Sequence, residues 1–346
     1  MSRALVISGG GCKGAFAVGV IKRLLQQYPK LSFDMFVGTS TGSLIAPLVA
    51  MNEIALLENL YTSLTTGDIV IEGRVGDLLS ETAIFDSSPL WKLLTHHYTD
   101  ERYTQLLATG KPVFLTTVCL QTGGLVVFTT EKNPPSVQNY QLQTLISADQ
   151  FRKAVMASAS QPVFMDPVLI NKNVPGDPHP NYQYVDGGVR EYAGVEIAIN
   201  NGATEIFTIL LSPDTKSTDN ITYANLFGIL QKTIDIFTDD VGKNDLIIPE
   251  QYNEALWYID AVKNKMLRSG LPQAQVNEYF NIDGKGNPFE DKRPLKLFMF
   301  RPDAPLGGGP GGLTFDAAEM AGMVAKGENT VNEFITDLNG AEISWA

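Results

Sequence analysis

The stretch FDMFVGTSTGSLIAPLVAM, residues 33–51, places a serine between a strand-like apolar run and a helix-like one. Its centre, GTSTG, has the form G-x-S-x-G, with Ser40 between Gly38 and Gly42. This pattern predicts a nucleophile elbow, a tight strand-to-helix turn that strains the serine backbone and exposes its hydroxyl. Small residues are needed on both sides because a Cβ there would collide with a neighbouring helix or strand. An ordinary glycine-rich turn that contains a serine is the alternative interpretation.

Strand-like runs recur on both sides of this turn, and several lack polar alternation, as expected of strands covered on both faces. They lie at residues 4–8, 33–38, 113–118, 125–130, 182–186, 205–211 and 295–300. Helical patterns fill many of the gaps, at residues 14–28, 42–64 and 147–160. The alternation predicts right-handed crossovers and a mainly parallel, layered sheet, which is an α/β architecture.

The C-terminal half has a different pattern. Residues 219–293 predict successive amphipathic helices, including residues 223–237 and 249–267. We expect them to form an outer layer of the sheet with part of it near the site; a cap over the active site is the alternative. Residues 302–314, PDAPLGGGPGGLT, predict a flexible proline-glycine loop before a final helix.

One stripe in this half has helical spacing. Such a stripe is typical of a helix that faces a core, and a surface for lipid access is the alternative interpretation. Its residues are Tyr223, Leu226, Phe227, Leu230, Ile234 and Phe237.

Composition excludes several classes of protein. The chain has 346 residues, 44% of them hydrophobic, and a net charge of −12. An acidic surface argues against nucleic acid, whose affinity comes from cationic contacts to phosphate, and it gives no long-range attraction to anionic lipid. The two cysteines, Cys12 and Cys119, form neither a metal-ligand cluster nor a disulfide framework.

The sequence predicts neither a signal peptide nor a membrane-spanning helix. The N-terminus has too few apolar residues before its glycines for a signal peptide. No stretch reaches the roughly 18 apolar residues needed to span a bilayer. We therefore expect a soluble, cytoplasmic protein that is peripheral at membranes if it contacts them.

A glycine-rich segment, SGGGCKG at residues 8–14, follows the first strand and opens the first helix. It matches G-x-G-x-x-G through Gly9, Gly11 and Gly14. A dinucleotide site would need an acid roughly 20 residues on, at the end of the second strand. Asp34 has this spacing but begins that strand, so the dinucleotide interpretation is disfavoured. A P-loop is excluded because G-x-x-x-x-G-K-[ST] is absent.

The same segment suits another role. The backbone N–H groups of Gly10 and Gly11 lie beside a helix N-terminus, where they can donate to an oxyanion. This loop would lie next to Ser40 if the first two strands are neighbours in the sheet.

A third motif, VDGG at residues 185–188, comes directly after the strand-like run YQYV. Asp186, followed by Gly187 and Gly188, can project into the same crevice as Ser40, although Asp-Gly is also a common turn.

A serine nucleophile needs a base, which is usually histidine. The three histidines, His96, His97 and His179, do not follow the serine, acid, histidine order of α/β-hydrolases. Asp186 is therefore the better partner, and burial would raise its basicity.

Together these motifs resemble the patatin-like lipid acyl hydrolases. The resemblance rests on the loop Gly9–Gly14, on the Ser40 elbow and on Asp186-Gly187-Gly188. The segments ASASQPVF, residues 157–164, and LTFDAAEMAGMVAKGE, residues 313–328, are also similar to the family. The similarity runs over residues 3–211 and returns at 295–328.

The resemblance implies a three-layer α/β/α fold with a mainly parallel sheet and additional helices in the C-terminal half. We expect residues 1–211 to form the catalytic core, 212–294 a helical insertion or outer layer, and 295–346 the final strand and helix of the same domain.

The resemblance also implies residue roles. Ser40 would be the nucleophile, Asp186 the base, and the amides of Gly10 and Gly11 the oxyanion hole, while Lys13 steadies the loop. The implied reaction cleaves carboxylic esters of lipids through an acyl-enzyme, with no metal or other cofactor and with transient contact to a membrane or micelle.

Some points depart from the family or stay open. After Asp186 the family usually has an Asn and a Pro; here VREYAGVEIA follows, which leaves the shape of that loop open. Two alternatives remain: a catalytically silent scaffold that binds lipid or protein, and a nucleotide-binding α/β protein. The sequence identifies no protein partner.

Overall fold

The strand-like runs form one sheet in the computed structural model, which describes residues 2–72, 82–214, 222–281, 287, 289 and 292–337. Within these residues the sheet has nine strands, with the order β11-β10-β1-β2-β5-β6-β7; β9 pairs with β5 and β8 with β9. Its strands are β1 (Arg3–Ile7), β2 (Met35–Gly38), β5 (Val113–Cys119), β6 (Leu125–Thr129), β7 (Gln141–Thr144), β8 (Val168–Asn171), β9 (Asn181–Asp186), β10 (Glu205–Ile209) and β11 (Lys296–Phe300).

Most strand pairs in this sheet are parallel, which confirms the expected α/β class. The pairs β1–β2, β1–β10, β10–β11, β2–β5 and β6–β7 are parallel. The pairs β5–β6, β5–β9 and β8–β9 are antiparallel. A separate two-stranded sheet joins β3 (Ile71–Glu72) to β4 (Phe85–Asp86).

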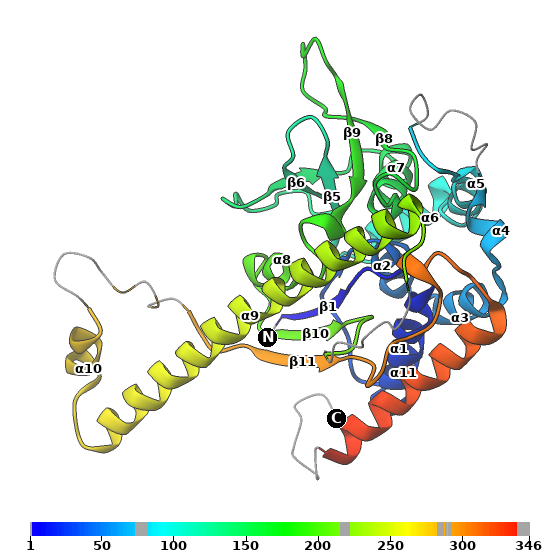
Figure 1. Cartoon of the computed structure of the whole chain (residues 1–346). Helices are drawn as coiled ribbons and strands as arrows, with labels where there is room; N and C mark the ends of the chain where they lie inside the picture. Colours follow the sequence, from blue (N-terminus) through cyan, green and yellow to red (C-terminus); the bar gives the residue numbers. More distant parts are fainter. Residues whose placement is uncertain are drawn as a thin grey trace.

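Helices cover both faces of the sheet, so the fold has three layers (Figure 1). Alternate residues of β1 point to the two faces of the sheet. Leu5 and Ile7 belong to a large core with helices on one face, and Ala4 and Val6 belong to a second core with α8 on the other face. The helices are α1 (Gly14–Gln27), α2 (Thr41–Ala50), α3 (Ile54–Ser63), α4 (Thr66–Ile69), α5 (Ser88–His97), α6 (Asp100–Ala108), α7 (Ala148–Ala159), α8 (Val195–Asn200), α9 (Leu226–Arg268), α10 (Gln273–Tyr279) and α11 (Ala317–Asp337). The described residues also form short 3-10 turns at η1 (Gly11–Lys13), η3 (Gly187–Val189) and η4 (Pro310–Gly312).

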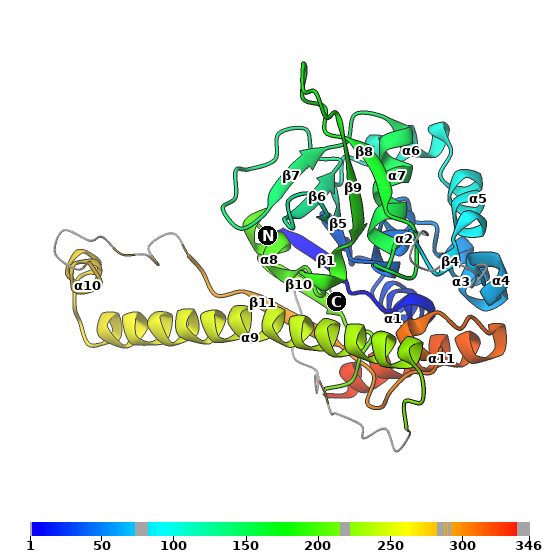
Figure 2. The ribbon, with the colours of Figure 1, turned by 45° about the horizontal axis from the view of Figure 1, so that its top comes forward.

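The first and last helices, α1 and α11, pack side by side (Figures 1 and 2). A Cβ at Gly19 would lie 2.0 Å from the Val324 carbonyl oxygen, and one at Gly327 would lie 2.2 Å from the Phe16 carbonyl oxygen. The two backbones thus approach each other through glycines, and the C-terminal helix is built into the same layer as the N-terminal one.

Two helical predictions were wrong in detail. The pattern over 42–64 is two helices, because Asn52 adopts a left-handed φ of 61° after α2 and so ends it. Conversely, the expected succession of helices after residue 219 is one 43-residue helix, α9, followed by the short α10. The helix α9 continues through Pro249, although proline usually breaks a helix.

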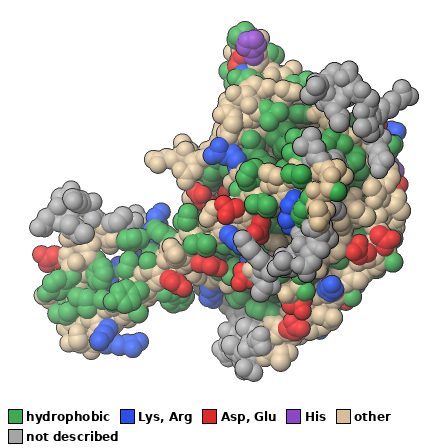
Figure 3. All heavy atoms as spheres, viewed as in Figure 1, with side chains coloured by type: hydrophobic (Ala, Val, Ile, Leu, Met, Phe, Trp, Pro, Cys, Tyr) green, Lys and Arg blue, Asp and Glu red, His purple; other side chains and the backbone are tan. Residues whose placement is uncertain are grey.

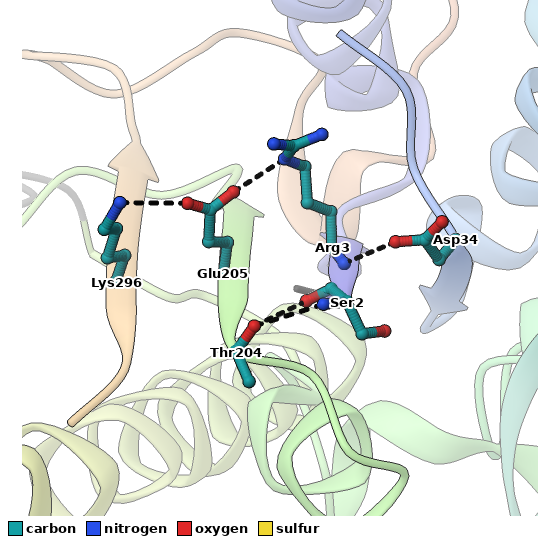
Figure 4. A network of polar contacts seen from close by, with 6 residues as sticks. All are labelled: Ser2, Arg3, Asp34, Thr204, Glu205 and Lys296. Atoms are coloured by element: carbon teal, nitrogen blue, oxygen red, sulfur yellow. Dashed lines mark hydrogen bonds and ion pairs between the residues drawn. The ribbon is translucent and has the colours of Figure 1, made fainter. Parts of the chain in front are cut away.

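The amino ends of the central strands are joined by a polar network (Figure 4). Glu205 of β10, 1% exposed, accepts from Arg3 Nε at 2.6 Å and from Lys296 Nζ at 3.1 Å. Burial raises the pKa of Glu205, but hydrogen bonds from the two cations outweigh burial and hold it below its usual range. Asp34 accepts from the Arg3 backbone N–H at 2.8 Å. Asp34 therefore makes its hydrogen bond at the amino ends of the strands, whereas the glycine-rich loop lies at their carboxyl ends. This separation disfavours a dinucleotide site further.

Among the described helices, none is both long enough and apolar enough to cross a membrane.

Candidate active site

Ser40 lies in the sharp turn between β2 and α2. Its φ of 55° and ψ of −123° lie outside the regions that non-glycine residues prefer, so the backbone strain expected of an elbow is present. A Cβ at Gly38 would lie 2.4 Å from the Gly42 carbonyl oxygen, and one at Gly42 would lie 2.1 Å from the Ile7 carbonyl oxygen. Both positions require glycine because backbone crosses there without space for a side chain.

A chain of buried hydroxyls fixes this turn to α7. The Ser40 backbone N–H donates to Ser158 Oγ at 3.1 Å, Ser158 Oγ lies 2.6 Å from Ser43 Oγ, and Ser43 Oγ donates to the Gly38 carbonyl at 2.7 Å. Because the Ser43 proton goes to Gly38, the Ser158 proton goes to Ser43. The lone pair of Ser158 then receives the Ser40 N–H, and the strained turn has its hydrogen bonds satisfied.

Asp186 reaches Ser40 because β2 and β9 both pair with β5 and end close together on it. The strand β2 is parallel to β5, and β9 is antiparallel to it. On β5, Gly38 pairs with Leu115 and Asp186 pairs with Thr117. The antiparallel β9 therefore runs towards the carboxyl end of β2. There the Ser40 side chain lies close enough to the Asp186 carboxylate to lower its pKa.

Asp186 is 6% exposed, and its carboxylate accepts from the Gly188 backbone N–H at 2.7 Å. Burial raises the pKa of Asp186 to about 6 and outweighs the hydrogen bonds from Ser40 and Gly188, which lower it. The next residue, Gly187, must be glycine because a Cβ there would lie 2.2 Å from Thr116 Oγ1. The carboxylate is thus held in a dry, tightly packed turn.

The glycine-rich loop lies directly over Ser40, since β1 and β2 are neighbours as expected. A Cβ at Gly9 would lie 3.1 Å from the Ser40 Cβ. Gly10 and Gly11 have φ of 152° and 59°, values that other residues rarely adopt. All three glycines line one cavity together with Ser40 and Asp186.

The proline-glycine loop expected over 302–314 packs against the outside of this glycine loop. A Cβ at Gly11 would lie 2.2 Å from the Gly312 carbonyl oxygen, and one at Gly312 would lie 2.2 Å from the Gly10 carbonyl oxygen. Another, at Gly308, would lie 2.1 Å from Cys12 Sγ. Residues more than 290 positions apart in the chain therefore shape the backbone of the loop over Ser40.

The cavity over Ser40 has a volume of about 820 Å³. On one side its wall is apolar and comes from four helices, α2 to α5, together with Met165, Leu313 and Phe315. The apolar side chains from these helices and from the residues that directly follow them are Leu44, Leu48, Leu57, Leu60, Leu64, Ile69, Leu90, Leu93 and Leu94, with the rings of Tyr61 and Tyr98. Such a wall is suited to a flexible hydrocarbon chain.

The α9 side of the cavity carries most of its charged side chains, together with some apolar ones. Lys232, Asp235, Asp239, Asp240 and Lys243 line it. Lys243 and Asp239 form an ion pair of 2.7 Å. Figure 3 shows acidic and basic side chains gathered where α9 crosses the body of the molecule. A ligand with an apolar tail and a polar end fits this division.

The residues of the predicted amphipathic stripe at the start of α9 differ in their surroundings. Leu230 and Ile234 pack partly buried against the core, whereas Phe237 is 61% exposed. Ile234 and Phe237 both line the cavity. The side chains of Leu226 and Phe227 lie outside the described part of the chain.

Asp245 attaches α9 to the loop that follows the aspartate motif. Its Oδ2 accepts from the backbone N–H groups of Tyr192 at 2.6 Å and Ala193 at 3.2 Å. Nearby, Glu191 Oε1 accepts from the Gly194 N–H at 2.8 Å. Burial raises the pKa of both carboxyls, and the charge of Asp245 raises that of Glu191 further. The loop after Asp186, whose sequence differs from the family pattern, therefore contacts α9.

The remaining candidates lie as follows. Lys13 and His97 line the cavity. Burial lowers the pKa of His97. A Cβ at Gly14 would lie 2.7 Å from Thr41 Oγ1, so this glycine lets α1 begin close to α2.

Two residues of the site carry no clear sequence signal of their own. Ser158 stands in the segment ASASQPVF, which the family resemblance singled out without naming the serine that bonds the elbow. Asp245 lies in a helix that no motif covers, and only its position in the fold connects it to the site.

The chain matches a family model described as "Patatin-like phospholipase" over residues 5–199, more than half of its length. A protein named cUMP-AMP-activated phospholipase, from Escherichia coli, is 39% identical over 66 residues, 17% of this chain and 20% of that protein. Probable lipid hydrolase 463L, from Invertebrate iridescent virus 6, is 24% identical over 204 residues, 57% of this chain and 63% of that protein. The chain spans less than two thirds of either relative.

Among solved structures, VipD from Legionella pneumophila is similar with a TM-score of 0.42 and 12% identity, over 97% of this chain and 67% of that one.

Proposed function

This chain belongs to the patatin-like phospholipase family, and from this membership and the geometry at Ser40 we propose that it is a serine lipid acyl hydrolase. The observation that carries the proposal is the convergence of Ser40, in its strained turn, the buried Asp186 and the glycine-rich loop on one cavity with apolar and polar parts. The substrate class is a carboxylic ester of a lipid, as in a phospholipid, lysophospholipid or related ester.

In the proposed first half-reaction, Ser40 Oγ attacks the ester carbonyl carbon while its proton passes to the Asp186 carboxylate. The carbonyl oxygen becomes an oxyanion, and the backbone N–H groups of Gly10 and Gly11 stabilise it. When the intermediate collapses, the bond to the alcohol oxygen breaks and Asp186 returns the proton to that leaving alcohol. The acyl chain remains on Ser40 as an ester.

In the second half-reaction a water molecule takes the place of the alcohol. Asp186 accepts one proton of that water as its oxygen attacks the acyl carbon, and it returns the proton to Ser40 Oγ as the acid leaves. The same carboxylate thus serves as base and acid in both halves.

The electrostatics of Asp186 support this role. An aspartate with an ordinary pKa of about 3.9 is a weak base towards a hydroxyl. Burial raises the pKa of Asp186 to about 6, which makes the carboxylate a stronger base and leaves it mostly ionised near pH 7. The Ser40 side chain already interacts with this carboxylate, so the proposed proton transfer needs no large rearrangement.

The two sides of the cavity support a lipid as the substrate. Its apolar wall, from α2 to α5, suits the acyl chain, and its polar side, along α9, suits the glycerol or headgroup end. The volume of about 820 Å³ lies within the range of about 300–1,000 Å³ typical of ligand pockets.

The test is labelling with a fluorophosphonate probe, which reacts with activated serines. We expect the wild type to be labelled on the peptide that contains Ser40, and both Ser40→Ala and Asp186→Asn to lose labelling and the hydrolysis of phosphatidylcholine in mixed micelles. Ser212→Ala is the matched control, since Ser212 also lines the cavity, and it should keep the label.

Two outcomes would contradict the proposal. Folded wild type that takes no label, with or without micelles, would favour a catalytically silent scaffold. Labelling that persists in Asp186→Asn at the wild-type rate would exclude Asp186 as the base.

A further inference from the structure

The second half of α9 extends beyond the body of the molecule. We call residues 247–268 the arm. At its inner end, Asn253 exchanges two hydrogen bonds with Leu295, the residue before β11: Leu295 N–H donates to Asn253 Oδ1 at 2.6 Å, and Asn253 Nδ2 donates to the Leu295 carbonyl at 3.0 Å. Past this point the arm projects away from the sheet, with α10 at its far end (Figures 1 and 2).

One face of the arm is already covered. Leu256 is 3% exposed, and the Tyr252 ring lies 5.6 Å from the Phe289 ring. Lys263 Nζ stands 5.1 Å from the centre of the Phe280 ring, which lies next to α10. This face packs against residues that follow α9 in the chain, among them Phe280 and Phe289.

A second face of the arm is exposed and apolar. Ile248 is 69% exposed, Tyr258 is 73% exposed, and Ala255 is also exposed. The positions Ile248, Ala255 and Val262 repeat every seven residues, and Tyr258 follows Ala255 by three. This is the a/d spacing of a helix that packs along another helix. Figure 3 shows hydrophobic side chains gathered on the arm.

Charges beside this face are arranged in two opposite halves. Glu250 and Glu254 lie in the first half, and Lys265 and Arg268 lie in the second. Helical periodicity places Glu250, Glu254 and Arg268 on one flank of the apolar stripe, because their separations of 4 and 14 residues are near whole turns, while Lys265, seven residues after Tyr258, ends the stripe itself. A flank that is acidic at one end and basic at the other complements itself only when a second copy runs antiparallel.

We propose that the arm pairs with the arm of a second copy of this chain, antiparallel about a two-fold axis. Ile248, Ala255, Tyr258 and Val262 form the seam, with Ala255 and Tyr258 nearest the axis. The carboxylates of Glu250 and Glu254 then face the cations of Lys265 and Arg268 of the other copy. A symmetric pairing of this kind closes on itself and leaves no further surface to grow from.

The periodicity and charge pattern favour a helix over a lipid surface as the occupant. A helix that lies on a membrane usually has a polar face rich in lysine and arginine, whereas the arm carries carboxylates as well as cations beside its apolar stripe. The seam from Ile248 to Val262 covers two heptads, about 21 Å of the arm.

The pairing also reaches the cavity through the same helix. Residues of α9 between Lys232 and Lys243 line the polar side of the cavity, and the arm is the continuation of that helix. Pairing therefore fixes the outer end of the helix whose inner end borders the cavity. The inference does not depend on the role of Ser40.

The first test is the molar mass of the full chain by size-exclusion chromatography with light scattering. We expect the mass of two chains for the wild type and of one chain for Ile248→Lys and for Tyr258→Asp. Ile146→Lys is the matched control, since Ile146 is 68% exposed on the body, and it should remain dimeric. Circular dichroism and the midpoint of urea unfolding report whether each variant is folded.

The second test reverses charges in two steps. Glu250→Lys with Glu254→Lys makes all four of these positions cationic and should yield monomers. Adding Lys265→Glu and Arg268→Glu restores complementarity in the opposite sense and should restore the dimer.

Three results would overturn the proposal. One is a wild type that stays monomeric at its highest soluble concentration. Another is a fourfold variant no more dimeric than the double one. The third is a monomeric wild type that floats with phosphatidylcholine vesicles and loses flotation in Tyr258→Asp, because this would assign the arm to lipid.

Discussion

At the scale of single residues, the site depends on a serine in a strained turn and an aspartate buried beside it. The strain at Ser40 is maintained by hydrogen bonds to its neighbours, chiefly from its backbone N–H to Ser158. The raised pKa of Asp186 results from burial, so the same packing that excludes water would prepare the proposed base. Both effects can be tested by small substitutions.

The pH dependence of hydrolysis should report Asp186. Because the carboxylate form is the base and its pKa is about 6, kcat/KM should rise as pH increases through 6 and then level off. Below pH 6 we expect a loss of about tenfold per pH unit. Rates on a soluble ester from pH 4.5 to 8.5 measure this; a midpoint near pH 4 would mean that burial does not raise the pKa.

Asp186 should also influence stability, with a definite sign. Its pKa is about 6 in the folded chain and near 3.8 when unfolded, so wild type loses stability as pH rises through 6. Asp186→Asn does not ionise, and at pH 8 it should exceed wild type by up to about 3 kcal/mol, a difference that vanishes towards pH 4. Urea unfolding at the two pH values measures it, and Asp149→Asn, on the surface, should show no such change.

Ser158 should act on the elbow without touching substrate. Ser158→Ala leaves the Ser40 N–H without its acceptor, so we expect a loss of about 1–2 kcal/mol in unfolding free energy. We also expect roughly a tenfold lower kcat, with KM little changed. Ser160→Ala is the matched control because the Ser160 hydroxyl bonds the Met156 carbonyl and not the elbow. Equal losses in both variants would contradict a role specific to the elbow.

At the scale of elements, two short strands and four helices decide what the cavity can hold. The meeting of β2 and β9 on β5 brings the two proposed catalytic side chains together. The helices α2 to α5 supply the apolar wall. The specificity for acyl length should therefore be set by side chains of these helices.

Filling the apolar wall should shorten the preferred acyl chain. Leu93 of α5 lines the cavity, and Leu93→Trp would occupy space that a long chain needs. We expect the ratio of kcat/KM for long over short p-nitrophenyl esters to fall about tenfold. Leu107→Trp, at a 41% exposed position on α6, is the control and should leave the ratio unchanged. An unchanged ratio in Leu93→Trp would place the acyl chain elsewhere.

At the scale of the whole molecule, α9 connects the cavity, the loop after Asp186 and the arm. Asp245 is the contact between this helix and that loop, and it lies near a second buried carboxyl, Glu191. Since burial raises both pKa values, the pair is stable when protonated and costs stability as pH rises and the groups ionise.

Removing one of the two charges should reduce this dependence. We expect the melting temperature of wild type to fall between pH 5 and pH 9, and that of Asp245→Asn to fall less, with a gain of about 1 kcal/mol at pH 9. The amide introduced by Asp245→Asn keeps an oxygen that can accept from the Tyr192 N–H. Asp303→Asn, at an exposed position, should follow wild type. If Asp245→Asn lost stability at every pH, the carboxylate charge would be stabilising.

Local patterns in the sequence were sufficient to predict the α/β class, most strands and the three motifs. Apolar runs mark buried strands, and glycines are required wherever backbone crosses backbone, as at Gly38 and Gly42. One continuous helix through Pro249 was not predicted, because local rules treat proline as a break. The division into domains at 211 and 294 stays a prediction.

The way in which the motifs combine depends on tertiary contacts. No pattern in the sequence indicated that β9 runs antiparallel to β5, yet this direction brings Asp186 to Ser40. The roles of Ser158 and Asp245 likewise come from contacts between segments more than 50 residues apart. Pairing across such distances depends on the packing of the whole chain, and no pattern within a single segment encodes it.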